Sequence, residues 1–421
     1  MSEDVHTAAA ASDPSGAEGR WTDLPWLVNA DPDRVLGLPA SGARLMAAVY
    51  RASLDVHRDA PPWVRQQLLA LDAARYGDRE LSARIAAVPV EDAGTEPWQV
   101  LWSTGARSGP HFRMNPSGHT GGVGAVVTTF SNGRRVVVTG SKDRTVRVRD
   151  LETGRPVGGA MSGLNGRVWA VAAEVVDGRP WIVTAGDWAV LAWDLATRRQ
   201  TGELPGINGE VWCLGTAVVQ GRPCALASDD DVSVRVWDLA SGEQVGELTG
   251  HDDFLMAIDT LVIDDRPRAV GCMSGGKVWQ WDLTTGQPVG EPLPGHDGEA
   301  WAVATAVVGG RAHAITAGHD ATVRVWDLVT GREVGRLVGH EGTVSAVVTA
   351  VIAGELRVVT GGSDGTVCLW EPAARRQIGR ELVFPAPVHA LTVTPEGSLV
   401  VGFGSDVAVL SLRADPDATG P

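Results

Sequence analysis

Two sets of side chains in this sequence have the composition of a nucleophilic catalytic triad. They are His296, Thr316 and Asp320, and then His340, Thr360 and Asp364. A hydroxyl, an imidazole and a carboxylate are the groups from which enzymes assemble an activated nucleophile and its general base. In addition, segment 361–365 (Gly-Gly-Ser-Asp-Gly) fits the G-x-S-x-G pattern of a nucleophile elbow.

The spacing of these residues favours a structural role. In both sets a tryptophan, Trp326 or Trp370, follows the Asp by 6 residues and the His by 30, and the two sets lie 44 residues apart. An active site does not recur from unit to unit, whereas a hydrogen-bonded support does. Segment 361–365 also lies between two expected strands, while a nucleophile elbow needs a strand followed by a helix. We therefore expect no catalytic residue here.

These sets belong to an internal repeat that covers most of the chain. The residue that ends each unit recurs at intervals of 44, 44, 44, 45 and 44 residues: Asp150, Asp194, Asp238, Asp282, Asp327 and Glu371. A degenerate copy ends near Leu412, which makes seven units. Unit 296–338 contains four segments of strand-like character separated by glycine-containing turns. Four short strands cannot bury two sheet faces alone, so neighbouring units must stack.

The unit resembles a WD40 repeat, with Gly-His near its start, Trp-Asp near its end and about 44 residues in between. The resemblance implies a mainly β fold, a seven-bladed β-propeller. It also implies that His296, Thr316, Asp320 and Trp326 form a buried hydrogen-bonded tetrad, as do their counterparts ending in Trp370. The other units are incomplete; for example, Arg149 replaces Trp in the first, and Leu164 replaces His in the second.

A second series of positions varies from unit to unit. Five residues after the His position stand Gly124, Trp169, Trp212, Met256, Trp301, Ser345 and His389, and two residues earlier stand, among others, Arg167, Glu210, Phe254 and Glu299. In the WD40 family this place opens the innermost strand at the top face, beside the central channel. Aromatic side chains and Met are enriched at protein interfaces. The series predicts a binding rim, although the same residues could simply plug the channel.

The composition excludes several classes of partner. The chain carries 36 basic and 51 acidic residues, a net charge of −15, with lysine only at Lys142 and Lys277. This balance argues against nucleic acid and anionic membranes, and no apolar run approaches the roughly 20 residues of a membrane span. The four cysteines show no metal-type pairing, so we expect buried free thiols in a cytoplasmic protein without metal or cofactor.

The N-terminal quarter has a different character. Residues 1–20 predict a disordered leader, and 21–97 a helical region with a linker at 91–96. Helices are expected near 32–36 and over about 41–58, 63–76 and 78–87. This region resembles the helical leader of some bacterial WD40-repeat proteins. A helix-turn-helix DNA-binding role is disfavoured because the region is itself acidic. The propeller is assigned to 98–413, and 414–421 to a disordered tail.

The last unit lacks a fourth strand, because the sequence after Leu412 is rich in Pro, Asp and Gly. In the other units this strand lies just before the Gly-His. Segment 110–116 has that place before His119, so it is predicted to complete the seventh blade and close the ring.

These observations predict a monomeric, non-catalytic scaffold that binds a protein or peptide through the top face. Trp169, Trp212, Phe254, Met256 and Trp301 would be the apolar anchors. The alternative is an enzyme or small-molecule binder that uses the channel mouth around His389, Arg167 and Glu210. A third possibility is that the helical region binds the partner and the propeller only carries it.

Overall fold

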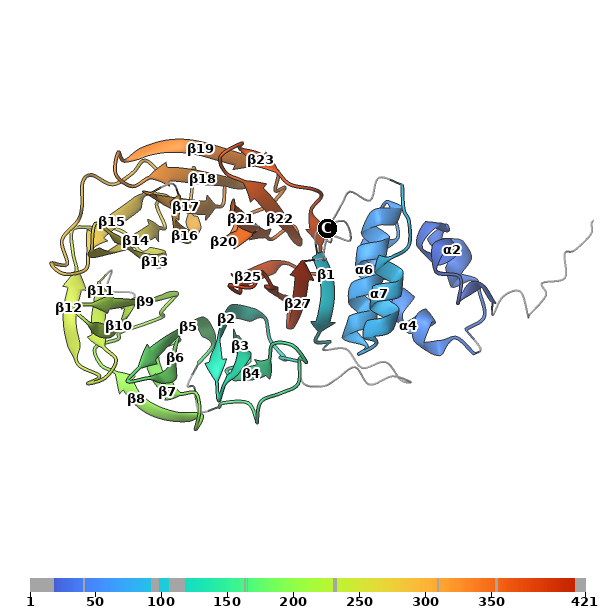
Figure 1. The fold of residues 1–421 in the computed structure, drawn as a ribbon, viewed down its shortest axis with the longest axis horizontal. Coiled ribbons are helices and arrows are strands. Elements are labelled where there is room, and N and C mark those ends of the chain that lie inside the picture. The colour runs from blue at the N-terminus through green and yellow to red at the C-terminus, as the bar shows by residue number, and fades with distance from the viewer. Residues whose placement is uncertain are drawn as a thin grey trace, which may run out of the picture.

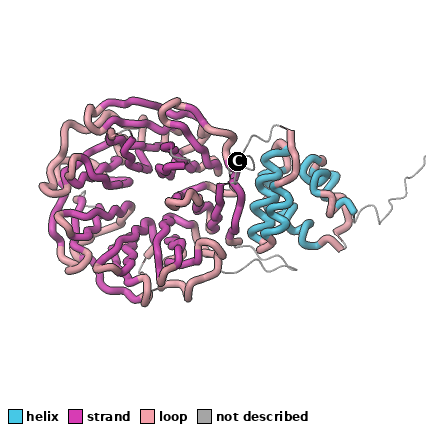
Figure 2. Tube along the Cα trace, viewed as in Figure 1, coloured by secondary structure: helices cyan, strands magenta, loops and turns pink. Residues whose placement is uncertain are grey.

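The computed structural model shows a ring of β-sheets with a group of helices against one side of it (Figures 1 and 2). It describes residues 19–40, 42–91, 98–105, 118–162, 164, 166–229, 233–308, 310–352 and 355–412. These residues form seven antiparallel sheets, so the predicted mainly β, seven-bladed propeller is confirmed.

The sheets are numbered here as blades 1 to 7. Blade 1 contains β2 (Val123–Ser131), β3 (Arg134–Ser141) and β4 (Val146–Asp150), and blade 2 contains β5 (Val168–Val176), β6 (Arg179–Gly186), β7 (Ala189–Asp194) and β8 (Arg199–Leu204). Blade 3 contains β9 (Cys213–Val219), β10 (Arg222–Ser228), β11 (Val234–Asp238) and β12 (Gln244–Leu248), and blade 4 contains β13 (Leu255–Ile263), β14 (Arg266–Met273) and β15 (Val278–Asp282). Blade 5 contains β16 (Ala300–Val308), β17 (Arg311–Gly318), β18 (Thr322–Asp327) and β19 (Arg332–Val338), and blade 6 contains β20 (Val344–Ile352), β21 (Glu355–Gly362), β22 (Thr366–Glu371), β23 (Arg376–Gln377) and β24 (Leu382–Val383). Blade 7 contains β25 (Val388–Val393), β26 (Leu399–Phe403), β27 (Asp406–Leu412) and β1 (Trp98–Ser103).

The innermost strands are β2, β5, β9, β13, β16, β20 and β25, and each contacts the next around the ring, with β25 returning to β2. The top face is the end of the ring at which these strands begin, and the bottom face is the end at which they turn into the second strand. The middle strands are buried on both sides between neighbouring blades, which explains their runs of Val, Ala and Ile. The four cysteines are free and buried, as predicted.

A series of hydrogen bonds also ties the innermost strands of blades 3 to 6 together. The hydroxyl of Thr260 donates to the carbonyl of Thr216 (2.7 Å), that of Thr305 to Thr260 (3.2 Å) and that of Thr349 to Thr305 (3.0 Å). Asp259 additionally accepts the backbone N–H of Thr305 at 2.7 Å. These bonds satisfy backbone groups at the inner edges of the sheets, which have no further strand to pair with.

Blades 1 and 4 have only three regular strands within the described residues. In both blades the fourth place is held by isolated bridges that include a proline, Arg149↔Pro156 in blade 1 and Trp281↔Pro288 in blade 4. Proline has no N–H to donate to a ladder, so the outer strand breaks there.

The ring closes by pairing the two ends of the propeller, as predicted, but through a different strand. The segment proposed for closure, 110–116, lies outside the described residues. The place beside β27 is taken by β1, in which Trp98 pairs with Leu412 and Ser103 pairs with Ala408. The indole N–H of Trp102 then donates to the carbonyl of Leu151 at 2.7 Å, which links the closing strand to blade 1. Counting back from Gly-His missed β1 because more residues separate β1 (ending at Ser103) from β2 (beginning at Val123) than separate the last strand from the next innermost strand in the other four-stranded units.

The N-terminal region contains α2 (Leu24–Asn29), α3 (Pro32–Leu36), α4 (Arg44–Ala52), α5 (Leu54–His57), α6 (Pro62–Arg75) and α7 (Arg79–Ala86). The helix expected over 41–58 is two helices, broken at the buried Ser53, and α2 was not predicted. Asp78 caps α7 by accepting the N–H of Leu81 at 2.8 Å. None of the described helices is long and apolar enough to cross a membrane.

Helices α6 and α7 pack against β1, and α6 also contacts β24 (Figure 1). A buried ion-pair cluster also joins the C-terminal end of α6 to β27, in which Arg75 donates to Asp72 and to Asp406, both at 2.8 Å. The side chains of these residues are only 8%, 0% and 5% exposed, respectively. The helical region is therefore joined to the closing blade by charged as well as apolar contacts.

Candidate functional site

The His–Thr–Asp sets are buried inside the blades. His296 contacts Asp320 through Nδ1 (2.9 Å) and Thr316 through Nε2 (2.8 Å), and Trp326 donates its indole N–H to the Thr316 hydroxyl (2.9 Å). A neutral imidazole protonated at Nδ1 satisfies both of its contacts. Burial, opposed by the contact with Asp320, lowers the pKa of His296.

The second set is built in the same way. His340 contacts Asp364 at 3.0 Å and Thr360 at 2.7 Å, and Trp370 donates to Thr360 at 2.7 Å. Thr360, like Thr316, is 0% exposed, so no substrate can reach either hydroxyl. The geometry is that of a cross-strand support.

The variable series of positions coincides with an irregularity of the backbone. In six of the seven innermost strands the pairing register shifts near the first residue, and the residues left out of register are Gly124, Trp169, Met256, Trp301, Ser345 and His389. A β-bulge leaves its extra residue without a ladder partner and redirects its side chain. In blade 3, Trp212 immediately precedes β9. The variable residues are thus presented around the ring at the top face, and we call them, with Arg167, Glu210, Phe254 and Glu299, the top rim.

Blade 1 shows why its bulge holds a glycine. A Cβ on Gly124 would lie 3.1 Å from the carbonyl oxygen of Val168 in the next blade. A side chain here would therefore need the backbone of blade 2 to shift by a few tenths of an ångström. The absence of an anchor at this position follows from close packing.

Blades 2 and 3 bring four of the predicted rim residues together. The rings of Trp169 and Trp212 have centroids 4.7 Å apart and are tilted by 31°. The guanidinium of Arg167 lies 4.8 Å from the Trp169 ring centroid, and the ammonium of Lys142 from blade 1 lies 4.9 Å from it. Cations at these distances are attracted to the face of an indole.

Asp187 organises this cluster. It accepts the indole N–H of Trp169 (3.0 Å) and both the backbone N–H (3.1 Å) and the Nε–H (3.0 Å) of Arg167, whose guanidinium also reaches Glu210 (2.8 Å). Burial would raise the pKa of Asp187, but these hydrogen bonds and the Arg167 charge outweigh burial and lower it.

Asp187 occupies the place of the tetrad Asp in the second unit. Where blade 1 has His119 in contact with Asp143 (3.0 Å), blade 2 has Leu164. Since no imidazole engages Asp187, its carboxylate is available to the rim. The missing His was the sequence signal for this cluster.

The remaining rim residues differ in exposure. Trp212 is 38% exposed and Phe254 is 48% exposed, while Met256 and Trp301 are half-buried and Glu299 is exposed. Among the described residues, no ring–ring contact extends the Trp169–Trp212 pair to Phe254 or Trp301. The indole N–H of Trp301 is buried without an acceptor in the described part of the chain.

Sequence reasoning missed Trp188, which is the most exposed tryptophan among the described residues, at 65%. It lies in the turn between β6 and β7, with a positive φ of 71°, and its N–H donates to Gly209 of blade 3 at 3.0 Å. Its size could have drawn attention to it, because the residues at the equivalent place in units 1 and 3 to 6 are Arg144, Val232, Gly276, Ala321 and Gly365.

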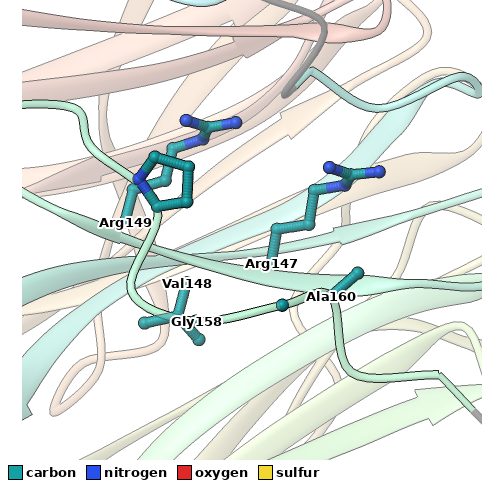
Figure 3. Close-up of a pocket in the computed structure, with 7 residues that line it drawn as sticks. Arg147, Val148, Arg149, Gly158 and Ala160 are labelled. Atoms are coloured by element: carbon teal, nitrogen blue, oxygen red, sulfur yellow. The ribbon is translucent and has the colours of Figure 1, made fainter.

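The side chain of His389 is exposed at the rim. Its pKa is nevertheless lowered, mainly because neighbouring protein atoms displace water from the imidazole and secondly because Lys142 carries a positive charge. Neutral His389 could serve as a base, but small-molecule chemistry there would also require a cavity. A shallow pocket that is open to solvent lies along blade 1, lined by Arg147, Val148, Arg149, Pro156, Gly158, Gly159 and Ala160 (Figure 3). None of these residues belongs to the top rim. The described residues also contain no group of three or more His, Cys, Asp or Glu placed to hold a metal ion.

Comparison with known proteins identifies three of the units. Residues 112–150, 286–327 and 331–371 match the family model of the WD domain, G-beta repeat. No curated protein matches the chain in sequence. The first match includes the unit in which Arg149 stands at the place of Trp, and the other two contain the complete tetrads.

Proposed function

We propose that this WD40-repeat β-propeller is a non-catalytic scaffold that binds a protein or peptide partner through its top rim. The observation that carries the proposal is the coincidence of the variable residues with the β-bulges. The tetrad residues are repeated and buried, whereas the bulge positions differ from blade to blade and include large aromatic side chains. Variation at a position that the fold directs outward is expected of a surface that recognises one particular partner.

The cluster around Trp169 supports the proposal because its anchors are already held in place. Trp169 is fixed by Asp187, and Trp212 leans against Trp169. A partner that binds such rigid aromatic groups pays little for ordering them. Exposed apolar area continues at Trp188 and Phe254, at 65% and 48% exposure.

The charges beside these anchors provide selectivity. Lys142 and Arg167 lie over one indole, and Glu210 lies beside them. Charges at the edge of an interface mainly steer partners and reject wrong ones. The partner should therefore combine an apolar or aromatic anchor with polar groups that match this mixed pattern.

The test uses the most exposed anchors, which contribute least to the fold. Trp212→Ala and Phe254→Ala are compared with Val245→Ala, an exposed apolar residue (45%) on β12, the outer strand of blade 3. Partners purified from the native host with the wild-type protein are identified by mass spectrometry and then titrated as pure proteins. Each top-rim change should weaken binding by about 2 kcal/mol, roughly 30-fold, and Val245→Ala should not. If both top-rim variants fold and still bind with wild-type affinity, the proposal is wrong.

A further inference from the structure

The bottom face carries a second ordered set of side chains that the repeat consensus does not explain. In blades 1 to 5 the residue that closes the hairpin between the first and second strands is always arginine: Arg134, Arg179, Arg222, Arg266 and Arg311. All five are exposed. In blade 6 the equivalent residue is Glu355, and blade 7 has a differently built turn ending at Leu399. The arginines therefore follow an arc over five consecutive blades.

An exposed apolar residue accompanies each arginine. It is the second residue before the turn on the innermost strand: Phe130 (52% exposed), Val175 (57%), Val218 (56%), Val262 (61%) and Val307 (59%). Val175 follows Trp169 by six residues on the same strand, so at about 3.3 Å per residue the two lie roughly 20 Å apart, at opposite ends of the ring. We call these ten residues the bottom arc.

The arginines keep most of their hydrogen-bonding capacity. Arg222, Arg266 and Arg311 are 62%, 68% and 75% exposed, and their carboxylate neighbours lie 3.7–3.8 Å away: Asp238, Asp282 and Asp327. Direct guanidinium–carboxylate bonds are about 2.7–2.9 Å.

Those carboxylates are recessed and already engaged. Asp327 is 5% exposed and accepts the backbone N–H of Thr330 at 2.8 Å, and Asp238 accepts that of Ala240 at 2.8 Å. They hold the turn that ends the third strand. The guanidinium groups above them therefore present unsatisfied donors to the solvent.

We propose that the bottom arc binds a protein segment in which acidic side chains alternate with apolar ones. Carboxylates of the segment would pair with the arginines, and its apolar side chains would cover the inner row of valines and Phe130. Arginine suits this task because its planar donors match a carboxylate bidentately. Acidic side chains also stand in these turns, Asp177 beside Arg179 and Asp264 and Asp265 beside Arg266, so the match to an acidic segment lies in the individual guanidinium groups along the arc and not in a uniformly positive face.

The same features disfavour two other occupants. A second copy of the chain would oppose one arginine arc with another. A membrane surface would call for long apolar or aromatic side chains that reach the acyl region, whereas four of the five apolar residues are valines. The inference does not rest on the function proposed for the top rim. Together, the two faces would let one molecule hold two different partners.

The experiment uses three short synthetic peptides in fluorescence anisotropy titrations. One alternates Glu with Leu and Phe, the second replaces the apolar residues by Ser, and the third replaces Glu by Lys. The wild-type protein should bind the first peptide most tightly, the second more weakly and the third not at all, with affinity falling as salt rises.

Matched variants locate the binding. Two triple variants should each weaken binding of the Glu/Leu/Phe peptide at least about tenfold. One combines Arg222→Glu, Arg266→Glu and Arg311→Glu, and the other combines Val218→Ser, Val262→Ser and Val307→Ser. The control is a third triple variant that makes the same charge change at exposed positions of the helical region: Arg34→Glu, Arg51→Glu and Arg84→Glu. It should leave peptide binding unchanged. All the substituted side chains are exposed, and thermal melts confirm that each variant is folded.

Several outcomes would overturn the inference. They are an absence of binding to the Glu/Leu/Phe peptide, an equal loss in the control variant, and tighter binding of the Lys peptide. Sedimentation with phosphatidylglycerol vesicles and analytical ultracentrifugation of the protein alone complete the test. The acidic-segment proposal is wrong if the Arg-to-Glu variant still binds the peptide but no longer binds vesicles or no longer self-associates.

Discussion

Replacing Arg75 by methionine should destabilise the whole protein, because this residue neutralises two buried carboxylates at once. It donates to Asp72 within α6 and to Asp406 of β27, each at 2.8 Å, with all three side chains at most 8% exposed. Methionine keeps the apolar stem that packs between the helix and the strand and removes only the charged head. The expected loss is therefore electrostatic.

The magnitude follows from what remains after the substitution. Removing one partner of a buried ion pair typically costs about 3–5 kcal/mol, since the other charge stays buried without compensation. Here two carboxylates remain, with one neutral hydroxyl beside each: Thr104 donates to Asp406 at 3.2 Å, and Ser53 lies beside Asp72. We expect a loss at the upper end of this range at neutral pH.

The loss should also depend on pH in a defined direction. Burial raises the pKa of Asp72 and of Asp406, and the charge of Arg75 opposes that rise. Without Arg75 the pKa of both carboxyls in the folded state rises further above that of the unfolded chain. The folded variant then holds extra protons, so its stability is favoured at low pH and lost as pH rises through the raised pKa. The deficit of Arg75→Met relative to wild type should be smaller at pH 5 than at pH 8.

Urea unfolding followed by tryptophan fluorescence and circular dichroism measures both effects. Arg79→Met is the matched control, because Arg79 also links the helical region to the ring, through an exposed bond to the carbonyl of Thr153 at 2.6 Å. It should cost less than about 1 kcal/mol. A loss below about 1 kcal/mol for Arg75→Met, or a deficit that is the same at both pH values, would refute the electrostatic argument.

Two further predictions concern the supports inside the ring. Thr316→Val should cost about 1–3 kcal/mol in urea unfolding, because it leaves both an imidazole nitrogen and an indole N–H without their buried partner. Thr184→Val in blade 2 should cost less, since that hydroxyl accepts from Trp193 at 3.0 Å and otherwise makes only a long bond of 3.5 Å to the carbonyl of Leu191 among the described residues. Equal losses would contradict the role given to the His. Trp102→Ala should cost about 3–5 kcal/mol, because this 4% exposed side chain links the closing strand to blade 1. Trp188→Ala, at 65% exposure, should cost well under 1 kcal/mol, and a similar melting temperature for the two variants would contradict closure through β1.

The repeat was sufficient to predict the blades because it encodes local interactions. Each unit contains its own alternating strands and turns, for example Asn132-Gly133, where both residues have a positive φ as a tight hairpin requires. Closure was harder to predict because it joins strands about 300 residues apart in the chain, Trp98 with Leu412. No periodicity relates these segments, so only the pairing in space identifies the strand that fills the edge.

The sequence alone predicted some residues of the top rim but not how they are arranged. Counting from the His position found Trp169, Met256 and Trp301, but it could not show that they are bulged or that Asp187 would hold Trp169 and Arg167 together. Leu164, which stands where the consensus has His, was the sequence signal that Asp187 lacks its usual partner. Which residues Asp187 contacts instead depended on how two neighbouring blades meet.

The sequence by itself determined that the chain builds seven similar sheets and that the tetrads support them. Hydrophobic period, turn residues and repeat length act within one unit, so they can be read along the chain. Only the tertiary structure decided which strand closes the ring, which residues gather at the top rim and that five arginines share one bottom arc with exposed apolar side chains. Those features come from contacts and alignments between blades, where positions some 44 residues apart in sequence become neighbours around a ring.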